Sequence, residues 1–149
     1  MTNKDSDLLK ACHITYDLRY HFVWIVKYRK AILFDSVIEK ALREILEEIG
    51  KRYWLNIQEL GTDGNHLHIF IQAAPRYSPS RIAQILKSLS ARELFKNFPK
   101  IRQELWGGQF WGDGFFVRSV GNEITSDVIQ RYIREQGKET NHGKQLRMF

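Results

Sequence analysis

Cysteine is nearly absent from this sequence, since Cys12 is the only one among 149 residues. One thiol can form neither a disulfide within the chain nor the thiolate cluster of a structural zinc site. The hydrophobic content of 43% is enough to bury a core without such cross-links. We therefore expect a protein of the reducing cytoplasm.

Long apolar runs are also missing. The longest uninterrupted stretches, such as residues 22–26, are far too short to span a bilayer. The first seven residues lack the basic-then-apolar pattern of a secretory signal, and no internal repeat or low-complexity segment is present. These absences favour one soluble domain over residues 1–149, with a core at about residues 14–139 and a polar segment at each end.

Acidic residues are fewer than basic ones, 17 against 23, which gives a net charge of +6. Such a balance fits a polyanionic partner, nucleic acid among them. It is equally typical of a surface that only keeps a protein in solution. Charge alone leaves both interpretations open.

The spacing of apolar residues predicts two amphipathic helices. Asp35 and the serine after it offer a cap, and apolar residues then recur at intervals of three and four up to about Gly50. Ser78 opens the second helix with a proline in its first turn, where proline is favoured. Its apolar stripe runs to about Phe95.

Four runs of β-forming residues predict strands. They occupy residues 15–27, 54–60, 65–71 and 115–120. Residues 61–64 (Gly-Thr-Asp-Gly) have the composition of a turn that joins the second strand to the third as a hairpin. Residues 99–114 carry three aromatic residues among glycines and are expected to form a loop.

A third helix is expected at residues 125–138, after a break at residues 121–122 and with Thr125 or Ser126 as its cap. Its helical spacing places Tyr132 and Gln136 one turn apart on one face. The order strand, helix, strand, strand, helix, strand, helix predicts an α+β fold. We expect a ferredoxin-like or RRM-like antiparallel sheet with packed helices, in which the C-terminal helix carries the tyrosine.

His66 and His68 alternate along the predicted third strand, so they should point to the same face of the sheet. Two imidazoles on one face can hold a divalent cation through ring nitrogens, and a third oxygen ligand would leave positions for phosphate oxygens. The alternative is a pair of packed or hydrogen-bonded histidines. Two histidines that share one face of a central strand need a partner of some kind.

Tyr132 and Gln136 would project a hydroxyl and an amide oxygen together from the last helix. A tyrosine hydroxyl is a nucleophile that can form a covalent intermediate with a phosphodiester. The alternatives are a tyrosine that bridges core and solvent, and a glutamine on the solvated helix surface.

Four separated segments occur in an order that resembles one family. They are residues 61–68 (Gly-Thr-Asp-Gly-Asn-His-Leu-His), 87–93 (Lys-Ser-Leu-Ser-Ala-Arg-Glu), 105–111 (Leu-Trp-Gly-Gly-Gln-Phe-Trp) and 132–137 (Tyr-Ile-Arg-Glu-Gln-Gly). The chain resembles the HUH single-tyrosine transposases of small bacterial and archaeal insertion sequences, a group with REP-associated relatives. The resemblance spans about residues 14–139.

This resemblance implies an enzyme that cleaves and rejoins single-stranded DNA at insertion-sequence ends. It implies that His66, His68 and Gln136 bind Mg²⁺ or Mn²⁺, and that Tyr132 is the catalytic nucleophile. Attack by the tyrosine gives a 5′-phosphotyrosine and a free 3′-OH, so the strand can be rejoined without ATP. The metal activates the scissile phosphate.

The resemblance also implies a homodimer that binds DNA hairpins in the prokaryotic cytoplasm, at the nucleoid. In that dimer the tyrosine helix of one subunit serves the histidines of the other. The break at residues 121–122 would give the helix the necessary freedom. The long apolar first strand would need cover along its edge, which a partner strand could provide.

Basic and aromatic residues suited to DNA are present. We expect the following to follow phosphates: Arg29, Lys30, Arg52, Arg81, Lys87, Arg92, Lys96 and Arg118. Trp106, Phe110 and Trp111 could stack on bases. The alternative is solvated charge and aromatic core.

Three other functions remain open at this stage. A binding-only RRM-like module would explain fold and charge but not the combination of histidines, tyrosine and glutamine. A domesticated relative would use the same chemistry on chromosomal palindromic repeats. A metal-dependent phosphodiesterase would use water in place of Tyr132.

Overall fold

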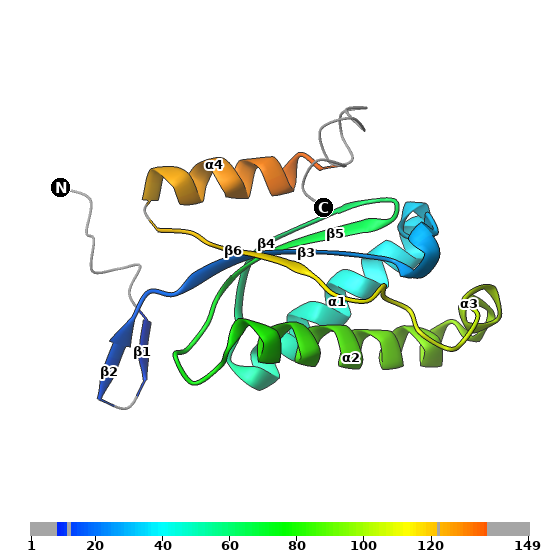
Figure 1. The fold of residues 1–149 in the computed structure, drawn as a ribbon, viewed down its shortest axis with the longest axis horizontal. Coiled ribbons are helices and arrows are strands. Elements are labelled where there is room, and N and C mark those ends of the chain that lie inside the picture. Colours follow the sequence, from blue (N-terminus) through cyan, green and yellow to red (C-terminus); the bar gives the residue numbers. More distant parts are fainter. Residues whose placement is uncertain (1–8, 12, 122, 137–149) are drawn as a thin grey trace.

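The computed structural model describes residues 9–11, 13–121 and 123–136 (Figure 1). Its centre is an antiparallel sheet in the order β4-β5-β3-β6. The strands are β3 (Arg19–Ile25), β4 (Asn56–Asp63), β5 (His66–Gln72) and β6 (Phe116–Ser119). Two helices, α1 (Ser36–Tyr53) and α2 (Pro79–Asn97), cover one face, and α4 (Glu123–Arg134) covers the other (Figure 1). This is the ferredoxin-like α+β arrangement that the sequence predicts.

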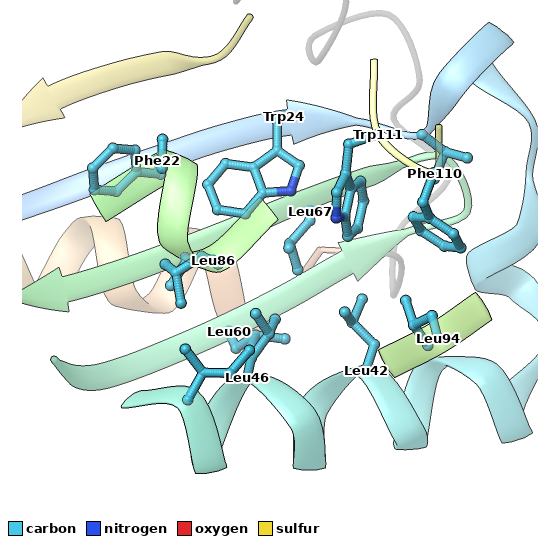
Figure 2. Packing of buried hydrophobic residues seen from close by; sticks show 14 of the residues in the cluster. Phe22, Trp24, Leu42, Leu46, Leu60, Leu67, Leu86, Leu94, Phe110 and Trp111 are labelled. Carbon is cyan, nitrogen blue, oxygen red and sulfur yellow. The ribbon is translucent and has the colours of Figure 1, made fainter. Parts of the chain in front are cut away.

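The main core lies between the sheet and the pair α1 and α2. Alternate residues of β3 and β5 point into it, among them Trp24 and Leu67, which are 1% and 0% exposed. Figure 2 shows them packed with Trp111 above leucines of α1. Because both central strands are also covered on their other face, β5 is buried along its whole length.

Helix caps form where the sequence predicts them. The Asp35 carboxylate accepts a hydrogen bond from the backbone N–H of Val37 at 2.9 Å, at the start of α1. The Ser78 hydroxyl accepts one from the N–H of Arg81 at 3.1 Å, at the start of α2. Each cap satisfies backbone donors that have no partner inside the helix.

The turn predicted at residues 61–64 is shorter and begins later in the chain, so its predicted bounds are wrong. Residues 61–63 extend β4 and pair with β5, Asp63 facing His66, and the turn is confined to residues 64–65. Gly64 makes this tight reversal possible with a φ of 59°. A longer β4 brings its end directly beside the histidines.

The predicted loop at residues 99–114 is also wrong in part, since α3 (Pro99–Glu104) begins with a proline in its first turn. The predicted strand at 15–27 is divided into β2 (Ile14–Tyr16) and β3, and β2 pairs with β1 (Leu9–Ala11). Two short 3₁₀ segments, η2 (Lys27–Arg29) and η3 (Ile32–Phe34), lead from β3 into α1.

The expectation that the first strand needs cover along an edge is wrong. β3 is an inner strand, paired with β5 on one side and with β6 on the other. Past the residues of β3 that pair with β6, the N–H of Gly112 donates to the carbonyl of Ile25 at 2.8 Å and so extends the hydrogen bonding along this edge of β3. Both sides of β3 are thus hydrogen-bonded within the chain. β4 and β6 form the edges of the described sheet.

The last helix begins two residues earlier than predicted, at Glu123, so Thr125 and Ser126 lie inside α4 rather than before its first residue. It ends at Arg134, and Gln136 follows in a turn whose N–H donates to the carbonyl of Ile133 at 3.2 Å. Asn122 and the predicted polar tail at 140–149 lie outside the described residues. Among the described helices, none combines the length and apolar character needed to cross a membrane.

Candidate active site beneath the C-terminal helix

His66 and His68 lie on the α4 face of β5, as their alternation predicts. Their exposed fractions are 6% and 1%. In the sheet register His68 stands between Val23 of β3 and Gly61 of β4. The pair is therefore fixed on β5, an inner strand whose backbone is held by hydrogen bonds on both sides.

A third histidine, His21 of β3, joins this pair and was missed by the sequence analysis. Its Nε2 lies 3.1 Å from Nδ1 of His68, and its own exposure is 1%. Nothing near His21 in the sequence indicates the contact. Only the antiparallel register of β3 and β5, which sets Val23 opposite His68, brings the two rings together.

Burial keeps these imidazoles neutral. It lowers the pKa of His68 to about 3 and the pKa of His21 to about 4. It also lowers the pKa of His66, against the opposing charge and backbone hydrogen bond of Asp63. Neutral imidazoles are the form that binds divalent cations.

The donor atoms of this site fit a cation. Nε2 of His68 is buried and has no hydrogen-bond partner within the described part of the chain. That part holds no group of three His, Cys, Asp or Glu residues able to bind a metal. A site built on His66 and His68 therefore takes further ligands from another residue type, from substrate or from water.

Tyr132 lies directly over His68. Its ring meets the ring of His68 edge to face, with centroids 5.7 Å apart and planes at 81°. Its side chain is half-buried, between the small apolar cluster of α4 and the site. The structure thus brings the predicted nucleophile together with His68, one of the predicted metal ligands.

The close docking of α4 depends on a glycine. A Cβ added at Gly61 would overlap the backbone carbonyl of Ile133, one residue after Tyr132. On the sheet, Phe70 and Val120 form the apolar patch that receives Ile129 and Ile133. The glycine in β4 therefore sets how near the tyrosine comes to the histidines.

Polar contacts hold both ends of α4 on the sheet. Near its start, the Arg19 guanidinium donates to the hydroxyl of Ser126 at 3.1 Å, inside the protein. At its end, Arg134 donates to the carboxylate of Glu59 at 3.0 Å on the surface. The buried contact contributes more to docking, because water screens the exposed pair.

Gln136 lies half-buried one turn beyond Tyr132, and its Nε2 donates to the backbone carbonyl of Tyr132 at 3.1 Å. The contact joins the Gln136 side chain to the backbone of Tyr132, beyond the end of α4. Its role as a metal ligand stays a prediction.

Three of the predicted DNA-binding residues share one groove. Lys87, Arg92 and Lys96 of α2 line a groove of about 780 Å³ that faces residues 108–113. Burial lowers the pKa of Lys87, whose ammonium donates to the carbonyls of Gly112 and Gly114 at 2.8 Å. Arg92 and Lys96 remain exposed.

The other predicted basic residues are dispersed. Arg118 lies on β6, over the ring of Phe116 at 5.5 Å, and its charge lowers the pKa of His21. Arg29 acts on the pKa of His66 in the same direction. Lys30 and Arg81 are exposed, in the segment after β3 and on α2 respectively, and neither lines the groove.

Arg52 lies at the far end of α1, 3.6 Å from Glu48.

The aromatic residues of the segment 105–111 are partly exposed and partly buried. Trp106 is 79% exposed, whereas Phe110 and Trp111 are buried at 0% and 5%, so the core alternative holds for these two. The indole N–H of Trp111 donates to the hydroxyl of Ser90 at 2.9 Å.

Comparison with known proteins gives a consistent result. Residues 14–136 match the family described as "Transposase IS200 like". The chain is 32% identical over 130 residues to the ISDra2 transposase TnpA of Deinococcus radiodurans, across 87% of this chain and 91% of that protein. It is 28% identical over 143 residues to the transposase for insertion sequence element IS200 of Salmonella typhimurium, across 95% and 91%.

Two solved structures share the fold. One, from Deinococcus radiodurans and described as a candidate transposase, superposes with a TM-score of 0.69 at 33% identity, covering 86% of this chain and 97% of that one. A REP-associated tyrosine transposase bound to a REP hairpin superposes with a TM-score of 0.55 at 14% identity, covering 83% and 70%. The family match over residues 14–136 and the identity to ISDra2 TnpA show that the chain belongs to the IS200-like family of single-tyrosine transposases.

Proposed function

We propose that this transposase cuts and rejoins single-stranded DNA through a covalent bond to Tyr132. The observation that carries the proposal is the placement of the Tyr132 ring 5.7 Å from that of His68, which with His66 forms a buried histidine pair on β5. The Tyr132 oxygen forms a bond to phosphorus, and the bond from phosphorus to the 3′ oxygen breaks. The phenol loses its proton and the 3′ oxygen gains one, so the products are a 5′-phosphotyrosine and a 3′-OH.

Rejoining is the reverse reaction with another 3′-OH. That hydroxyl attacks the phosphotyrosine, a new phosphodiester forms, and Tyr132 is released. The number of phosphate ester bonds is unchanged at every stage, so no nucleotide hydrolysis is required. Exchange of the attacking 3′-OH converts excision at insertion-sequence ends into insertion elsewhere.

His66 and His68 would hold Mg²⁺ or Mn²⁺ through ring nitrogens, with the amide oxygen of Gln136 as the third protein ligand. When bound, the cation withdraws charge from the scissile phosphate, which makes attack by a phenol possible near neutral pH. Support comes from the lowered pKa values of both histidines and from the buried Nε2 of His68.

The substrate reaches this site only if α4 moves. With α4 on its own sheet, His66 and His68 are 6% and 1% exposed. We also propose a homodimer in which Tyr132 of one subunit serves the histidine pair of the other. The patch formed by Phe70 and Val120, which receives α4 in the single chain, would receive the α4 of the partner subunit.

The proposed substrate is single-stranded DNA with a hairpin. The structurally similar REP-associated transposase is bound to such a hairpin. In this chain the groove lined by Lys87, Arg92 and Lys96 offers a basic surface on α2, across the sheet from α4 (Figure 1). A hairpin held there would leave its single-stranded flank free to run to the other face.

Tyr132→Phe tests the chemistry. We expect the variant to bind a labelled hairpin oligonucleotide as wild type does, since the ring is kept and only the hydroxyl is lost. It should form no covalent adduct on a denaturing gel with Mg²⁺ or Mn²⁺ present. Cleavage that persists in this variant would make water the nucleophile and the protein a metal-dependent phosphodiesterase.

A further inference from the structure

The hydrogen bond between His21 and His68 connects the two inner strands of the sheet. Nε2 of His21 lies 3.1 Å from Nδ1 of His68, and both side chains are 1% exposed. The contact follows from the register of β3 and β5. It is therefore present whether α4 of the same subunit or of a partner covers the site.

Only one hydrogen atom can occupy this bond, because the two nitrogens are 3.1 Å apart. A neutral imidazole has one N–H and one nitrogen lone pair. One of the two facing nitrogens donates and the other accepts. The choice fixes which nitrogen of each ring carries the hydrogen of that ring.

The two possible arrangements differ in what His68 can bind. If His21 donates, the hydrogen of His68 is on Nε2, and this nitrogen cannot bind a cation. If His68 donates from Nδ1, its Nε2 keeps a lone pair. His21 engages Nδ1 in both arrangements, so Nε2 is the one nitrogen of His68 left for a cation.

A cation on Nε2 requires the second arrangement. This atom is buried, and within the described residues no protein group bonds to it. A buried nitrogen without a protein partner is costly unless a ligand completes it. In metalloproteins, the second ring nitrogen of a histidine ligand regularly donates to an acceptor that orients the ring.

We propose that His21 is a positioning residue for His68, which accepts the Nδ1 hydrogen of His68 and so keeps the Nε2 lone pair available for a divalent cation. This inference rests on the proposed function, in which His66 and His68 hold Mg²⁺ or Mn²⁺. It assigns to an imidazole the task that a carboxylate or a backbone carbonyl performs at other sites.

Three substitutions of His21 separate hydrogen bonding from packing. Glutamine places its amide oxygen at about the distance of Nε2 along the side chain, so His21→Gln keeps the acceptor. Asparagine reaches only as far as Nδ1, so His21→Asn keeps a polar amide but not the contact. His21→Phe keeps the ring and removes the acceptor.

We expect Mn²⁺ titration calorimetry on the full chain to follow the acceptor. His21→Gln should bind Mn²⁺ close to wild type, whereas His21→Asn and His21→Phe should lose about 10- to 100-fold in affinity. Phe22→Leu is the control for instability, because Phe22 is fully buried on the opposite face of β3. It should unfold more easily yet bind Mn²⁺ as wild type does.

Ring ¹⁵N–¹H correlation spectra of the metal-free protein test the tautomer without metal or activity. In wild type and in His21→Gln, the hydrogen of His68 should be on Nδ1. In His21→Phe it should move at least in part to Nε2, since the acceptor that held it is gone.

The outcomes distinguish failure of the His21 positioning role from failure of the proposed metal site. A wild-type His68 with its hydrogen on Nε2, or Mn²⁺ affinity that is unchanged in both His21→Asn and His21→Phe, would overturn the positioning role. If wild type binds no Mn²⁺, or if His66→Ala binds it as tightly, the proposed metal site fails and the positioning role with it. Loss of binding in His66→Ala beside an unaffected His21 series would reject only the role of His21.

Discussion

Gly61 and Ile133 are in such close contact that the carbonyl oxygen of Ile133 occupies the position of a side chain on Gly61. The contact joins β4 to α4 one residue after Tyr132. Every proposed step at Tyr132 depends on the distance between α4 and the histidines of β5. α4 can come this close because Gly61 has no Cβ.

Gly61→Ala should therefore displace α4 and reduce cleavage. The added methyl group must push the helix backbone away, and a displacement near 1 Å at a reacting group can cost about 100-fold in rate. Single-turnover cleavage of a labelled oligonucleotide measures the effect. Val37→Ala, at an exposed position of α1 on the other face of the sheet, is the control and should leave the rate near that of wild type. Equal rates for both variants would mean that docking at Gly61 does not limit the reaction.

Stability of the metal-free protein should fall as the pH drops below about 6.5. Burial lowers the pKa of His21 to about 4 and of His68 to about 3, so in that range the unfolded chain takes up protons that the folded chain does not. Stability is full above the unfolded pKa and is lost progressively down to the folded pKa. Each histidine contributes a slope of up to about 1.4 kcal/mol per pH unit.

Urea unfolding between pH 7 and pH 4.5 in the presence of a chelator would measure this slope. His21→Gln has one titrating group fewer, so its free energy of unfolding should depend less steeply on pH. A slope identical to that of wild type would show that His21 is not held neutral by burial.

Mixing two inactive variants tests the composite site. Tyr132→Phe and His66→Ala should each be inactive as homodimers. If catalysis is in trans, their heterodimer contains one site with an intact tyrosine and an intact histidine pair, and cleavage should return to a fraction of the wild-type level. Co-expression with two affinity tags isolates the heterodimer. Absence of activity in a verified heterodimer would assign the tyrosine to its own sheet.

The basic groove on α2 makes a prediction about salt. Combined Arg92→Gln and Lys96→Gln should weaken hairpin binding and reduce the slope of log affinity against log salt by about 1.8, if each residue neutralises one phosphate of the duplex stem. Lys40→Gln with Lys51→Gln removes the same charge from the exposed surface of α1. Equal changes in both double variants would indicate an effect of net charge alone.

Local patterns in the sequence determine much of the architecture. Apolar spacing and the caps at Asp35 and Ser78 are sufficient for α1 and α2, because helix formation depends on neighbours three and four residues away. The common face of His66 and His68 follows from strand alternation in the same way. Each of these features is decided within a few residues of chain.

The remaining features depend on which distant segments meet. β3 is an inner strand because β6, almost a hundred residues later, pairs with it, and its apolar composition alone does not distinguish an inner strand from a covered edge. Phe110 and Trp111 are core residues for a similar reason, since the segment that carries them packs onto β3 and α2.

The site itself shows the same division. The sequence by itself determined the histidine pair and the tyrosine helix, since both follow from local periodicity and motif. Tertiary structure alone decided that His21 engages His68 and that Gly61 receives Ile133. Both contacts join elements far apart in the chain at distances of a few ångströms, and strand register and helix docking, which fix such distances, come from the packing of the whole fold.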